Sequence, residues 1–577
     1  MGLRICLVTP FSWSQPHDVN EHVAGAAGAL RDLGHKVTVL APSNRAADLL
    51  AGRRALQDGA RPDVIALGPA VPISRRSRIG LPVGVRANLA LALARGDFDV
   101  VHGFEPGLPS LSYLALRDTR SLAVATFFSP DRLGYPPGRT QRKRLLARVD
   151  ALLSTSSETA AAADVRFPGK YDVVPLGVDT GVFAPGRKRK LAVCEWRVGE
   201  RPLTRAVISV FRELPDWELL LLRTKALSGR PSIPPSLRDR VRVRTAASSA
   251  ARAALLNEAQ IFVPATNGID RVELEARAAG NAIAAPPGVS EQPALAAAAL
   301  ARLAENDELR TSGQEDARRS AESQSFVELG SRLDEVYRGL SGRRRTRSRS
   351  QDPLSNRPWI DCDLHMHTSW SHDCLVEPEE LLDHAEEVGL GAIAVTDHNA
   401  FGGALEAVEL GRDRPLIVIP GEEVKTAGQG EVIGLFLKEE IPRGLSFADT
   451  IAAIREQGGL VYLPHPFDRM HAIPDAATLH KHLADIDVFE VYNARLLFEQ
   501  YNDEALRFAR KYNLTMGAGS DAHVLQGVGT GGLQMRAFRD PEEFLVSLRS
   551  AEILRRPRSL AYLQALKWKA QVKERVR

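Results

Sequence analysis

Short apolar segments alternate with amphipathic helical segments along most of this 577-residue chain. The first two apolar segments are "RICLVTP" and "KVTVLAP", and "NEHVAGAAGALRDLG" between them places Val23, Ala26, Ala27, Leu30 and Leu33 on one helical face. A continuously apolar run of this length is typical of a strand that is buried on both faces, and a helix between two such strands is typical of a parallel crossover unit. The alternation therefore predicts α/β domains built on parallel sheets.

The same alternation predicts two consecutive domains in the first 340 residues. Residues 1–185 continue with the strand-like segments "FDVVHGF", "SLAVATFF" and "ALLSTSS", so we expect a doubly wound parallel sheet there. The alternation restarts with "KLAVCEW", "WELLLLRT" and "IFVPAT", and a second domain of the same kind is expected over residues 186–340. Two Rossmann-like domains in succession would leave a cleft between them.

A change of composition marks the next boundary. Residues 341–358 contain "RRRTRSRSQDPLSNRP", in which arginine, serine and proline leave nothing to bury. This composition predicts a solvated linker. A second interpretation is a contact with an anionic partner such as RNA, a membrane surface or polyphosphate. The net charge of the whole chain is only +4, so nucleic acid is not indicated as the main partner.

A third α/β series occupies residues 359–577. Its strand-like segments are "DCDLHMH", "GAIAVTD", "PLIVIPG", "EVIGLFL", "GLVYLPH", "DVFEVYN" and "LTMGAGSD". Six or seven parallel strands with helices between them favour a closed barrel, and an open sheet is the alternative.

Polar side chains stand where these predicted strands end. In "DLHMH" the side chains alternate between the two faces of the strand, so His365 and His367 are aimed at one point. Further histidines and carboxylates follow the other strands: Asp373, Asp397, His398, Glu422, Glu423, His465, Asp521 and His523. Imidazole and carboxylate suit zinc, manganese or iron, and the strand ends of a barrel form one face, so a metal site is predicted there. The other histidines of this region are expected on the surface: His372, His384, His471, His480 and His482.

The motifs "DLHMHTSWSHD", "TDHN", "PGEEV", "LPHPF" and "GSDAH" resemble those of the polymerase and histidinol phosphatase (PHP) superfamily of metal-dependent phosphoesterases. The resemblance covers residues 359–577 and implies a distorted (β/α)7 barrel with two or three divalent ions (Mn, Fe or Zn). It implies one ion held by His365, His367, Glu423 and Asp521, a second held by Glu423 and His465, and a third held by Asp373, His398 and His523.

One position departs from the family pattern. Where many members have a histidine, "GEVIGLFL" has Glu431, which we predict to complete the ligands of the second ion. An added carboxylate favours a harder ion such as manganese. We expect Asp363 to orient one of the imidazoles.

The resemblance implies hydrolysis of a phosphomonoester or phosphodiester of a small molecule or nucleotide. Metal ions bind phosphate oxygens and lower the pKa of a bound water toward ~7, so a side-chain nucleophile is not required. Arg469, Asn493 and Arg495 are candidates for contacting the phosphate, and a salt bridge within the protein is the alternative for each arginine.

The first two domains resemble retaining glycosyltransferases of the B-type fold, with two Rossmann-like domains. The segments "NEHVAGAAGALRDLGHKVTVLAP", "FDVVHGFEP", "VVPLGVDTGVF" and "VELEARAAG" carry the resemblance, over roughly residues 3–310. It implies a cleft that binds a nucleotide-activated sugar.

Several functional positions of that family are altered here. The usual glycine-rich turn reads "SQPHDVNEH", and Phe104 and Phe128 replace two usual histidines. Arg197 remains of the basic donor-phosphate motif. Of two usual glutamates, Asn267 replaces the first, and Glu275 remains as a candidate for a ribose hydroxyl, with an exposed helix carboxylate as its alternative. We therefore expect a region that has lost or changed its catalysis, which could still bind a nucleotide-sugar.

Three functions stay open at this point. The first is a metal-dependent phosphoesterase with a degenerate glycosyltransferase-like region, the second is an active glycosyltransferase with an accessory phosphoesterase, and the third is a non-catalytic nucleotide- or glycan-binding protein. Four scattered cysteines and the absence of a long apolar run predict a cytoplasmic protein. The basic amphipathic tail "RRPRSLAYLQALKWKAQVKER" predicts a helix that packs on the barrel or makes a peripheral membrane contact.

Overall fold

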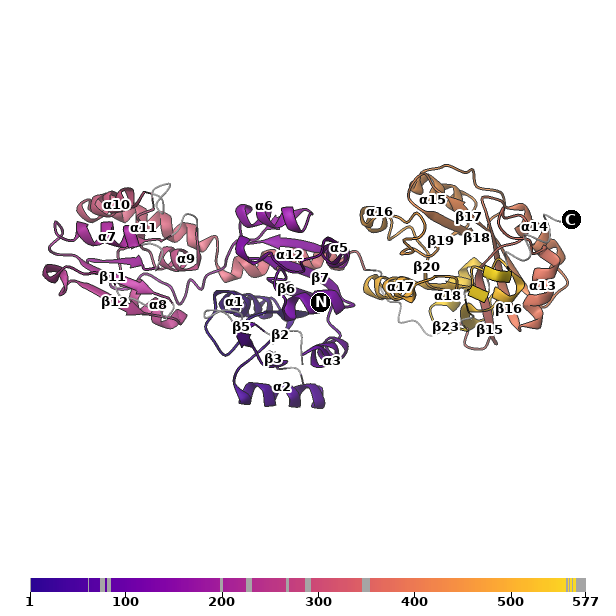
Figure 1. Ribbon diagram of the computed structural model, residues 1–577, viewed down its shortest axis with the longest axis horizontal. Helices are drawn as coiled ribbons and strands as arrows, with labels where there is room; N and C mark the ends of the chain where they lie inside the picture. Colours follow the sequence, from indigo (N-terminus) through magenta and orange to yellow (C-terminus); the bar gives the residue numbers. More distant parts are fainter. Residues whose placement is uncertain are drawn as a thin grey trace. The chain divides into compact units, whose positions relative to one another are not determined.

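The structure is a computed structural model of the chain (Figure 1). It describes residues 2–60, 62–72, 78–79, 85–197, 201–224, 231–265, 269–285, 292–344, 353–556, 559, 561–562 and 564–566. The contacts within it divide the chain into two compact units, Met1–Leu340 and Ser341–Arg577. The boundary near residue 185 stays a prediction. Asn267, the linker residues 345–352 and most of the tail lie outside the described residues.

The first unit begins with a seven-stranded sheet in the order β3-β2-β1-β6-β7-β8-β9, in which all neighbouring strands are parallel. Its strands are β1 (Arg4–Val8), β2 (Lys36–Ala41), β3 (Val64–Ala66), β6 (Val100–Phe104), β7 (Leu122–Phe127), β8 (Ala151–Ser154) and β9 (Tyr171–Val173). The helices are α1 (Asp18–Asp32), α2 (Ala46–Asp58), α3 (Arg86–Gly96), α4 (Leu111–Asp118), α5 (Arg139–Leu146) and α6 (Ser157–Arg166), and a short hairpin joins β4 (Val71–Pro72) to β5 (Arg78–Ile79). The strand order turns back between β1 and β6, as in a doubly wound fold.

A second parallel sheet follows in the order β12-β11-β10-β13-β14. Its strands are β10 (Leu191–Glu195), β11 (Glu218–Arg223), β12 (Val241–Thr245), β13 (Ile261–Val263) and β14 (Ala282–Ile283). Its helices are α7 (Arg201–Val210), α8 (Ser249–Leu256), α9 (Arg271–Ala278), α10 (Pro293–Glu305) and α11 (Asp307–Glu322). The last helix, α12 (Phe326–Ser341), returns to the first sheet, where the hydroxyl of Tyr337 lies 2.6 Å from Nδ1 of His102. The prediction of two Rossmann-like folds is confirmed.

The second unit contains a nine-stranded sheet in the order β21-β20-β19-β18-β17-β16-β15-β22-β23 (Figure 1). Its strands are β15 (Trp359–Met366), β16 (Leu390–His398), β17 (Ile417–Lys425), β18 (Glu431–Leu435), β19 (Leu460–Leu463), β20 (Val488–Asn493), β21 (Met516–Gly519), β22 (Gly531–Arg536) and β23 (Glu552–Arg555). Its helices are α13 (Pro378–Glu387), α14 (Gly402–Leu410), α15 (Phe447–Glu456), α16 (Ala476–Lys481), α17 (Glu499–Tyr512) and α18 (Pro541–Leu548).

The chain just after β21 closes this sheet against β15. The amide of Asp521 donates to the carbonyl of His365 at 2.8 Å, and the amide of His367 donates to the carbonyl of Ala522 at 3.1 Å. Seven strands, β15 to β21, therefore surround one core, and the prediction of a distorted (β/α)7 barrel is confirmed.

The prediction that these strands are all parallel was wrong for β18. It is antiparallel to both β17 and β19. Only residues 426–430 separate β17 from β18, and Gly428 and Gly430 adopt positive φ in that turn. Because a parallel connection needs a crossover of a dozen or more residues, a five-residue turn permits only a hairpin.

Among the described residues, no helix is both long and apolar enough to cross a bilayer.

Candidate functional site

One end of the barrel collects the predicted metal ligands. Strands β15, β16, β17, β19, β20 and β21 end there, because they run in the same direction. The antiparallel strand β18 begins there, and its first residue is Glu431. The reversal of β18 therefore brings Glu431 to the same end as the ligands that follow the parallel strands.

Glu423 occupies the centre of this group and is almost completely buried. Its Oε2 lies 3.3 Å from Nε2 of His365 and 3.0 Å from Nδ1 of His398. Its Oε1 lies 3.1 Å from Nε2 of His465. One carboxylate thus contacts imidazoles from three strand ends, which is the arrangement expected of a bridging ligand.

His367 and Asp521 extend the group. Nε2 of His367 lies 3.4 Å from Oδ1 of Asp521 and 3.5 Å from Oε2 of Glu423, and it has no hydrogen-bond partner among the described residues. A buried imidazole nitrogen without a hydrogen bond is unfavourable unless a ligand takes that place. This nitrogen, with nitrogen and oxygen donors around it, fits a divalent cation.

Four sets of donor atoms are close enough to share an ion. In each set, the donor atoms all lie within 4.8 Å of one another. The sets are His365, His367 and Asp521; His365, Glu423 and His465; His398, Glu423 and Glu431; and His367, His398 and His523. The ligand assignment made from the sequence stays a prediction, but its histidines and carboxylates do meet in one buried cluster.

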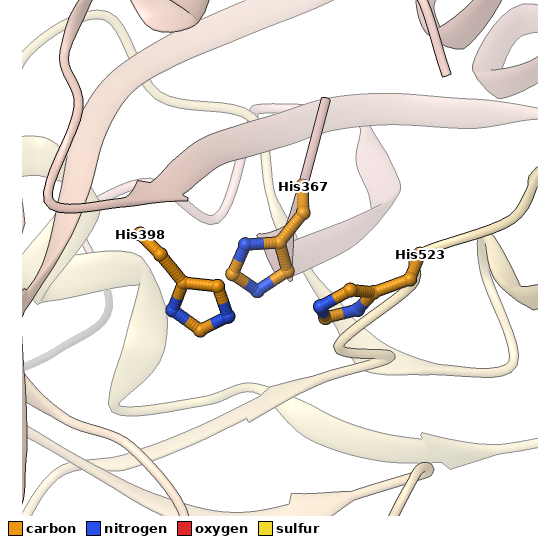
Figure 2. A group of neighbouring side chains, drawn as sticks. All are labelled: His367, His398 and His523. Carbon is orange, nitrogen blue, oxygen red and sulfur yellow. The ribbon is translucent and has the colours of Figure 1, made fainter. Parts of the chain in front are cut away.

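Figure 2 shows His367, His398 and His523 with their rings turned toward a common centre. The ring centroid of His367 lies 4.3 Å from that of His398 and 4.3 Å from that of His523. Asp373 joins them, because its Oδ2 lies 3.1 Å from Nε2 of His523 and its Oδ1 lies 3.8 Å from Nε2 of His398. The residues predicted for the third ion are therefore adjacent.

The backbone is strained at two of these positions. His465 has a φ of 25° and Asp521 has a φ of 52°. Residues other than glycine rarely adopt positive φ, and such strain concentrates at functional sites. Glu431 completes this side of the cluster, since its Oε2 lies 3.7 Å from Nε2 of His465.

The cluster also shifts the pKa values of its members. Burial opposes ionisation of Glu423, but the neighbouring His365 and His398 hold its pKa well below the ordinary value. Burial likewise opposes protonation of His465, but Glu423 raises the pKa of this imidazole to about 9. Burial and the nearby His523 and His398 lower the pKa of His367. Imidazoles and carboxylates therefore shift one another's pKa values within one buried space.

Glu490 in β20 orients the cluster, although the sequence did not indicate it. Its carboxylate lies 3.1 Å from Nδ1 of His365 and accepts hydrogen bonds from the hydroxyl of Tyr462 at 2.8 Å and the amide of His465 at 2.6 Å. A carboxylate on the far nitrogen of an imidazole fixes the nitrogen that faces a metal. The segment "VFEVYN" has no motif that marks this role for Glu490.

Asp363 does not orient an imidazole, so that prediction was wrong. Its carboxylate accepts hydrogen bonds from the amides of Ser520 at 2.9 Å and Gly529 at 3.0 Å. It instead fixes the chain that follows β21. Nδ1 of His367 lies 3.2 Å from the hydroxyl of Ser371, which donates to buried Asp397 at 2.6 Å.

The predicted phosphate contacts differ in their positions. Nη1 of Arg495 lies 3.0 Å from Oδ1 of Asp521 and donates to Nε2 of His523 at 3.1 Å. The side-chain amide of Asn493 donates to Oδ2 of Asp521 at 3.2 Å. Arg469 lies apart from these residues, 3.7 Å from Glu504. Arg495 and Asn493 are thus part of the cluster, and their contact with a phosphate stays a prediction.

The prediction that the other histidines lie on the surface was wrong for His482, which is buried. His471 is exposed as predicted, but it also lies next to the cluster. The ring of His471 lies 5.6 Å from the ring of His465, although its own side chain is 57% exposed. Nδ1 of His471 lies 2.8 Å from Oδ2 of Asp468. The loop after β19 folds back over the cluster, and the sequence does not show that return.

The first unit contains a cleft of about 1200 Å³. Its walls come from both parallel sheets: Ser129 and Arg132 follow β7, Arg197 follows β10, and Arg271 begins α9. This is the place where a nucleotide-activated sugar was expected.

Arg197 is already paired within this cleft. Its guanidinium contacts Oε2 of Glu195 at 3.0 Å and also forms an ion pair with Asp270. Burial and the nearby Asp270 raise the pKa of Glu195 to about 7. Two carboxyl groups beside one guanidinium oppose the binding of a further anion.

Glu275 is buried rather than exposed, so the alternative of an exposed helix carboxylate was wrong. Nε of Arg252 donates to its Oε2 at 2.6 Å, and Nη2 of Arg252 donates to its Oε1 at 2.7 Å. A bidentate ion pair therefore occupies this carboxylate. Its contact with a ribose stays a prediction.

The turn after β1 is filled by side chains. His17 accepts a hydrogen bond from the amide of Val19 at 3.2 Å and stacks on Phe11, with ring centroids 3.5 Å apart. Phe128, which follows β7, packs edge-on against His22, with ring centroids 4.9 Å apart. The altered positions His17 and Phe128 thus carry rings that pack against other rings, and His17 occupies the turn where the family pattern has glycine.

Three family models match the chain. Residues 19–182 match the model of glycosyltransferase family 4, residues 363–510 match the PHP domain, and residues 499–553 match the PHP-associated region.

Relatives include an uncharacterized protein of Methanocaldococcus jannaschii, which is 39% identical over 147 residues, covering 23% of this chain and 82% of that protein. A phosphatidyl-myo-inositol mannosyltransferase of Mycolicibacterium smegmatis is 27% identical over 382 residues, covering 59% of this chain and 95% of that protein. Among solved structures, a glycosyltransferase of Rickettsia africae is 15% identical with a TM-score of 0.41, covering 58% of this chain and 97% of that one.

Proposed function

Since the chain belongs to the PHP domain family through residues 363–510 and carries a glycosyltransferase family 4 region before it, we propose that it is a metal-dependent phosphoesterase. The observation that supports this proposal is the buried cluster of histidines and carboxylates at one end of the barrel, in which Nε2 of His367 has no hydrogen-bond partner among the described residues. The substrate class is a phosphomonoester or phosphodiester of a small molecule or nucleotide.

The residues that would hold two or three divalent ions are His365, His367, Asp373, His398, Glu423, Glu431, His465, Asp521 and His523. When bound, such ions polarise a phosphate and supply an activated water near neutral pH. Manganese, iron and zinc fit this mixture of imidazole and carboxylate, and Glu431 favours manganese.

The chain's own residues orient and charge the site. Glu490 accepts a hydrogen bond from Nδ1–H of His365, and Nε2 of that ring faces Glu423. Arg495 always carries a positive charge, and it lies beside Asp521 at the edge of the cluster. We assign to Arg495 and Asn493 the contacts with the substrate phosphate, with Arg469 as an outer contact.

We further propose that the glycosyltransferase-like region no longer transfers sugar. Arg197 is neutralised by Glu195 and Asp270, and Glu275 is paired with Arg252. The alternative is an active glycosyltransferase, and the similarity to mannosyltransferases over more than half of the chain favours it. A purely binding role for a nucleotide or glycan is the third possibility. A cytoplasmic location is also our proposal.

Metal analysis together with a panel of phosphoesters tests the first proposal. We expect the purified protein to retain at least one equivalent of manganese, iron or zinc, and to hydrolyse some member of the panel. Asp521→Asn should abolish hydrolysis. Metal-free protein that stays inactive with every added ion would contradict the phosphoesterase.

Titration with a panel of nucleotide-sugars separates the two interpretations of the first unit. We expect neither transfer nor hydrolysis of the donor by the wild type. Transfer that disappears in Glu275→Ala would establish the glycosyltransferase instead.

A further inference from the structure

A serine hydroxyl lies at the far nitrogen of the His367 ring. Nδ1 of His367 is 3.2 Å from the hydroxyl of Ser371, in the segment that follows β15. In Figure 2 the ring of His367 lies between those of His398 and His523, and its centroid is 4.3 Å from both. These neighbouring rings restrict how His367 can turn. They do not decide which of its nitrogens carries the proton, because that depends on the hydrogen bonds of the ring.

The hydrogen bonds of Ser371 settle the direction of its contact with His367. A hydroxyl has one hydrogen to donate and two lone pairs that accept. The hydrogen goes to the carboxylate of Asp397 at 2.6 Å, because a carboxylate only accepts. The amide of His398 donates to the same hydroxyl at 3.1 Å and takes one lone pair. The other lone pair is left for Nδ1 of His367, so this nitrogen is the donor.

The carboxylate of Asp397 is itself held in place. It is buried, and it accepts hydrogen bonds from the amide of Thr368 at 2.7 Å and from the hydroxyl of Thr368 at 2.6 Å. The backbone of Gly403 in α14 lies against it, since a Cβ added there would come within 2.2 Å of Oδ2. A carboxylate that is fixed in this way keeps the hydrogen of Ser371 turned away from His367.

Nε2 of His367 is then left with a lone pair. This nitrogen is buried and has no hydrogen-bond partner among the described residues. A proton on it would be a buried donor without an acceptor, which is costly, whereas a lone pair can bind a cation. Carboxylate oxygens of Asp521 and Glu423 lie 3.4 Å and 3.5 Å from it. An acceptor nitrogen beside two carboxylates is a favourable place for a divalent cation.

His523 reaches the same tautomer by a different contact. Its Nδ1 lies 3.0 Å from the backbone carbonyl of Asp521, which can only accept, so Nδ1 carries the proton. Its Nε2 accepts a hydrogen bond from Nη1 of Arg495 at 3.1 Å, which requires a lone pair there. The ring of His523 therefore does not depend on Ser371.

We propose that Ser371 is a positioning residue, which together with Asp397 fixes His367 in the tautomer with its proton on Nδ1 and so presents Nε2 as the electron-pair donor to a divalent cation. This inference rests on the proposed phosphoesterase function, because it takes that cation to be the metal ion of the reaction.

Nitrogen NMR of the metal-free full-length protein, with isotope-labelled histidine rings, tests the tautomer directly. A ring nitrogen that carries a proton resonates far from one that does not, and the signals of His367 are identified by their loss in His367→Gln. We expect the wild type to carry the proton of His367 on Nδ1. In Ser371→Ala this nitrogen loses its acceptor, and we expect the proton to distribute over both nitrogens.

Manganese titration of the same variants gives a second measurement. The loss of an orienting partner weakens metal binding about 10- to 100-fold, and we expect a loss of this size in Ser371→Ala. Ser371→Thr keeps the hydroxyl and should keep both the tautomer and the affinity. The matched control is Ser369→Ala, because the hydroxyl of Ser369 donates to Glu377 at 3.0 Å. This control should bind manganese as the wild type does.

His523 separates a positioning role from a general disturbance of the cluster. Because the carbonyl of Asp521 holds its Nδ1, Ser371→Ala should leave the tautomer of His523 unchanged. A change in both rings would make Ser371 a structural residue and overturn the inference. A proton on Nε2 of His367 in the wild type would also overturn it, as would an unchanged tautomer or an unchanged manganese affinity in Ser371→Ala.

The two proposals fail in different ways. If Ser371→Ala changes the tautomer and the metal affinity, but the wild type hydrolyses no phosphoester, the phosphoesterase is contradicted and the role of Ser371 remains. If hydrolysis is abolished in Asp521→Asn, but Ser371→Ala changes neither the tautomer nor the metal affinity, the phosphoesterase remains and the positioning role is removed.

Discussion

The barrel cluster and the cleft of the first unit both contain buried charged side chains, but they satisfy them differently. In the cluster, donors from several strand ends converge, and Nε2 of His367 has no hydrogen bond among the described residues. In the cleft, Arg197 pairs with Glu195 and Asp270, and elsewhere in the first unit Arg252 pairs with Glu275. The residue types expected of a site are present in both regions. In the cluster, a buried donor atom is still available to bind a ligand, whereas in the first unit the charged groups already bind one another.

Removing the central carboxylate of the cluster should have the largest effect. Glu423→Gln should lower the metal affinity by more than about 1000-fold, because orienting residues alone are worth about 10- to 100-fold and Glu423 contacts three imidazoles directly. Metal titration measures the change. The control Glu409→Gln makes the same substitution on an exposed side chain. Full metal content in Glu423→Gln would show that the cluster does not depend on its centre.

Breaking the buried ion pair between Arg252 and Glu275 in the first unit should lower its stability. Arg252→Met leaves the buried carboxylate of Glu275 without its bidentate partner, and such a loss costs about 3–5 kcal/mol. Urea denaturation of the full chain, followed by hydrogen exchange of strands in each unit, measures the effect separately for the two units. Arg189→Met breaks exposed pairs with Glu218 and Glu258 and should cost less than about 1 kcal/mol. If Arg252→Met and Arg189→Met lower the free energy of unfolding equally, the pair between Arg252 and Glu275 does not stabilise the fold more than an exposed pair does.

Glu490 extends the comparison between the two regions. Its buried carboxylate contacts His365, a predicted metal ligand, whereas the buried carboxylate of Glu275 contacts an arginine. Glu490→Gln should weaken metal binding by about 10- to 100-fold through His365. The matched control is Glu499→Gln, whose carboxylate is exposed. Unchanged metal affinity in Glu490→Gln would mean that the hydrogen bond to His365 does not orient the ring.

The smallest expected effect concerns pH. Burial raises the pKa of Glu195 to about 7 from an ordinary value of 4.5. The folded first unit therefore keeps a proton that the unfolded chain releases, so the stability from this group is complete below pH 4.5 and is lost as the pH rises through 7.

Raising the pH from about 5 to 8 should thus lower the stability of the first unit by about 1–2 kcal/mol. Glu195→Gln should flatten this slope, as measured by hydrogen exchange in β10 at several pH values. In the second unit, the carboxylates Glu423 and Asp521 have lowered pKa values despite burial, so their contribution has the opposite sign and is lost as the pH falls. If the stability of the first unit still falls with rising pH in Glu195→Gln, another group causes the pH dependence.

The fold was predictable because apolar periodicity reports burial directly. The parallel sheets of the first unit and the seven-stranded barrel follow from it. The direction of β18 was misjudged, although the short turn "TAGQG" before it already limits the chain to a hairpin. The length of this turn is therefore better evidence for the direction of β18 than the pattern of the neighbouring strands.

The grouping of these histidines and carboxylates was predictable because strand ends in a barrel share one face. His365 and His367 follow from alternation within one strand, and Asp521 and His523 from the end of another. Glu490 and His471 were missed, since an inward-facing glutamate in mid-strand and a histidine in a loop carry no local signal. The role of Glu490 depends on a hydrogen bond to His365, which is distant in the sequence, and the place of His471 depends on how the loop after β19 folds back toward His465.

By itself, the sequence determined the α/β architecture, the place of the cluster at the strand ends and the altered positions of the glycosyltransferase-like region. Only the tertiary structure decided which charges are already paired. Arg197 and Glu275 look available in the sequence, yet Asp270 and Arg252 occupy them. The physical reason is that periodicity and spacing are local properties, whereas the partner of a buried charge is set by long-range packing that brings distant side chains within hydrogen-bonding distance.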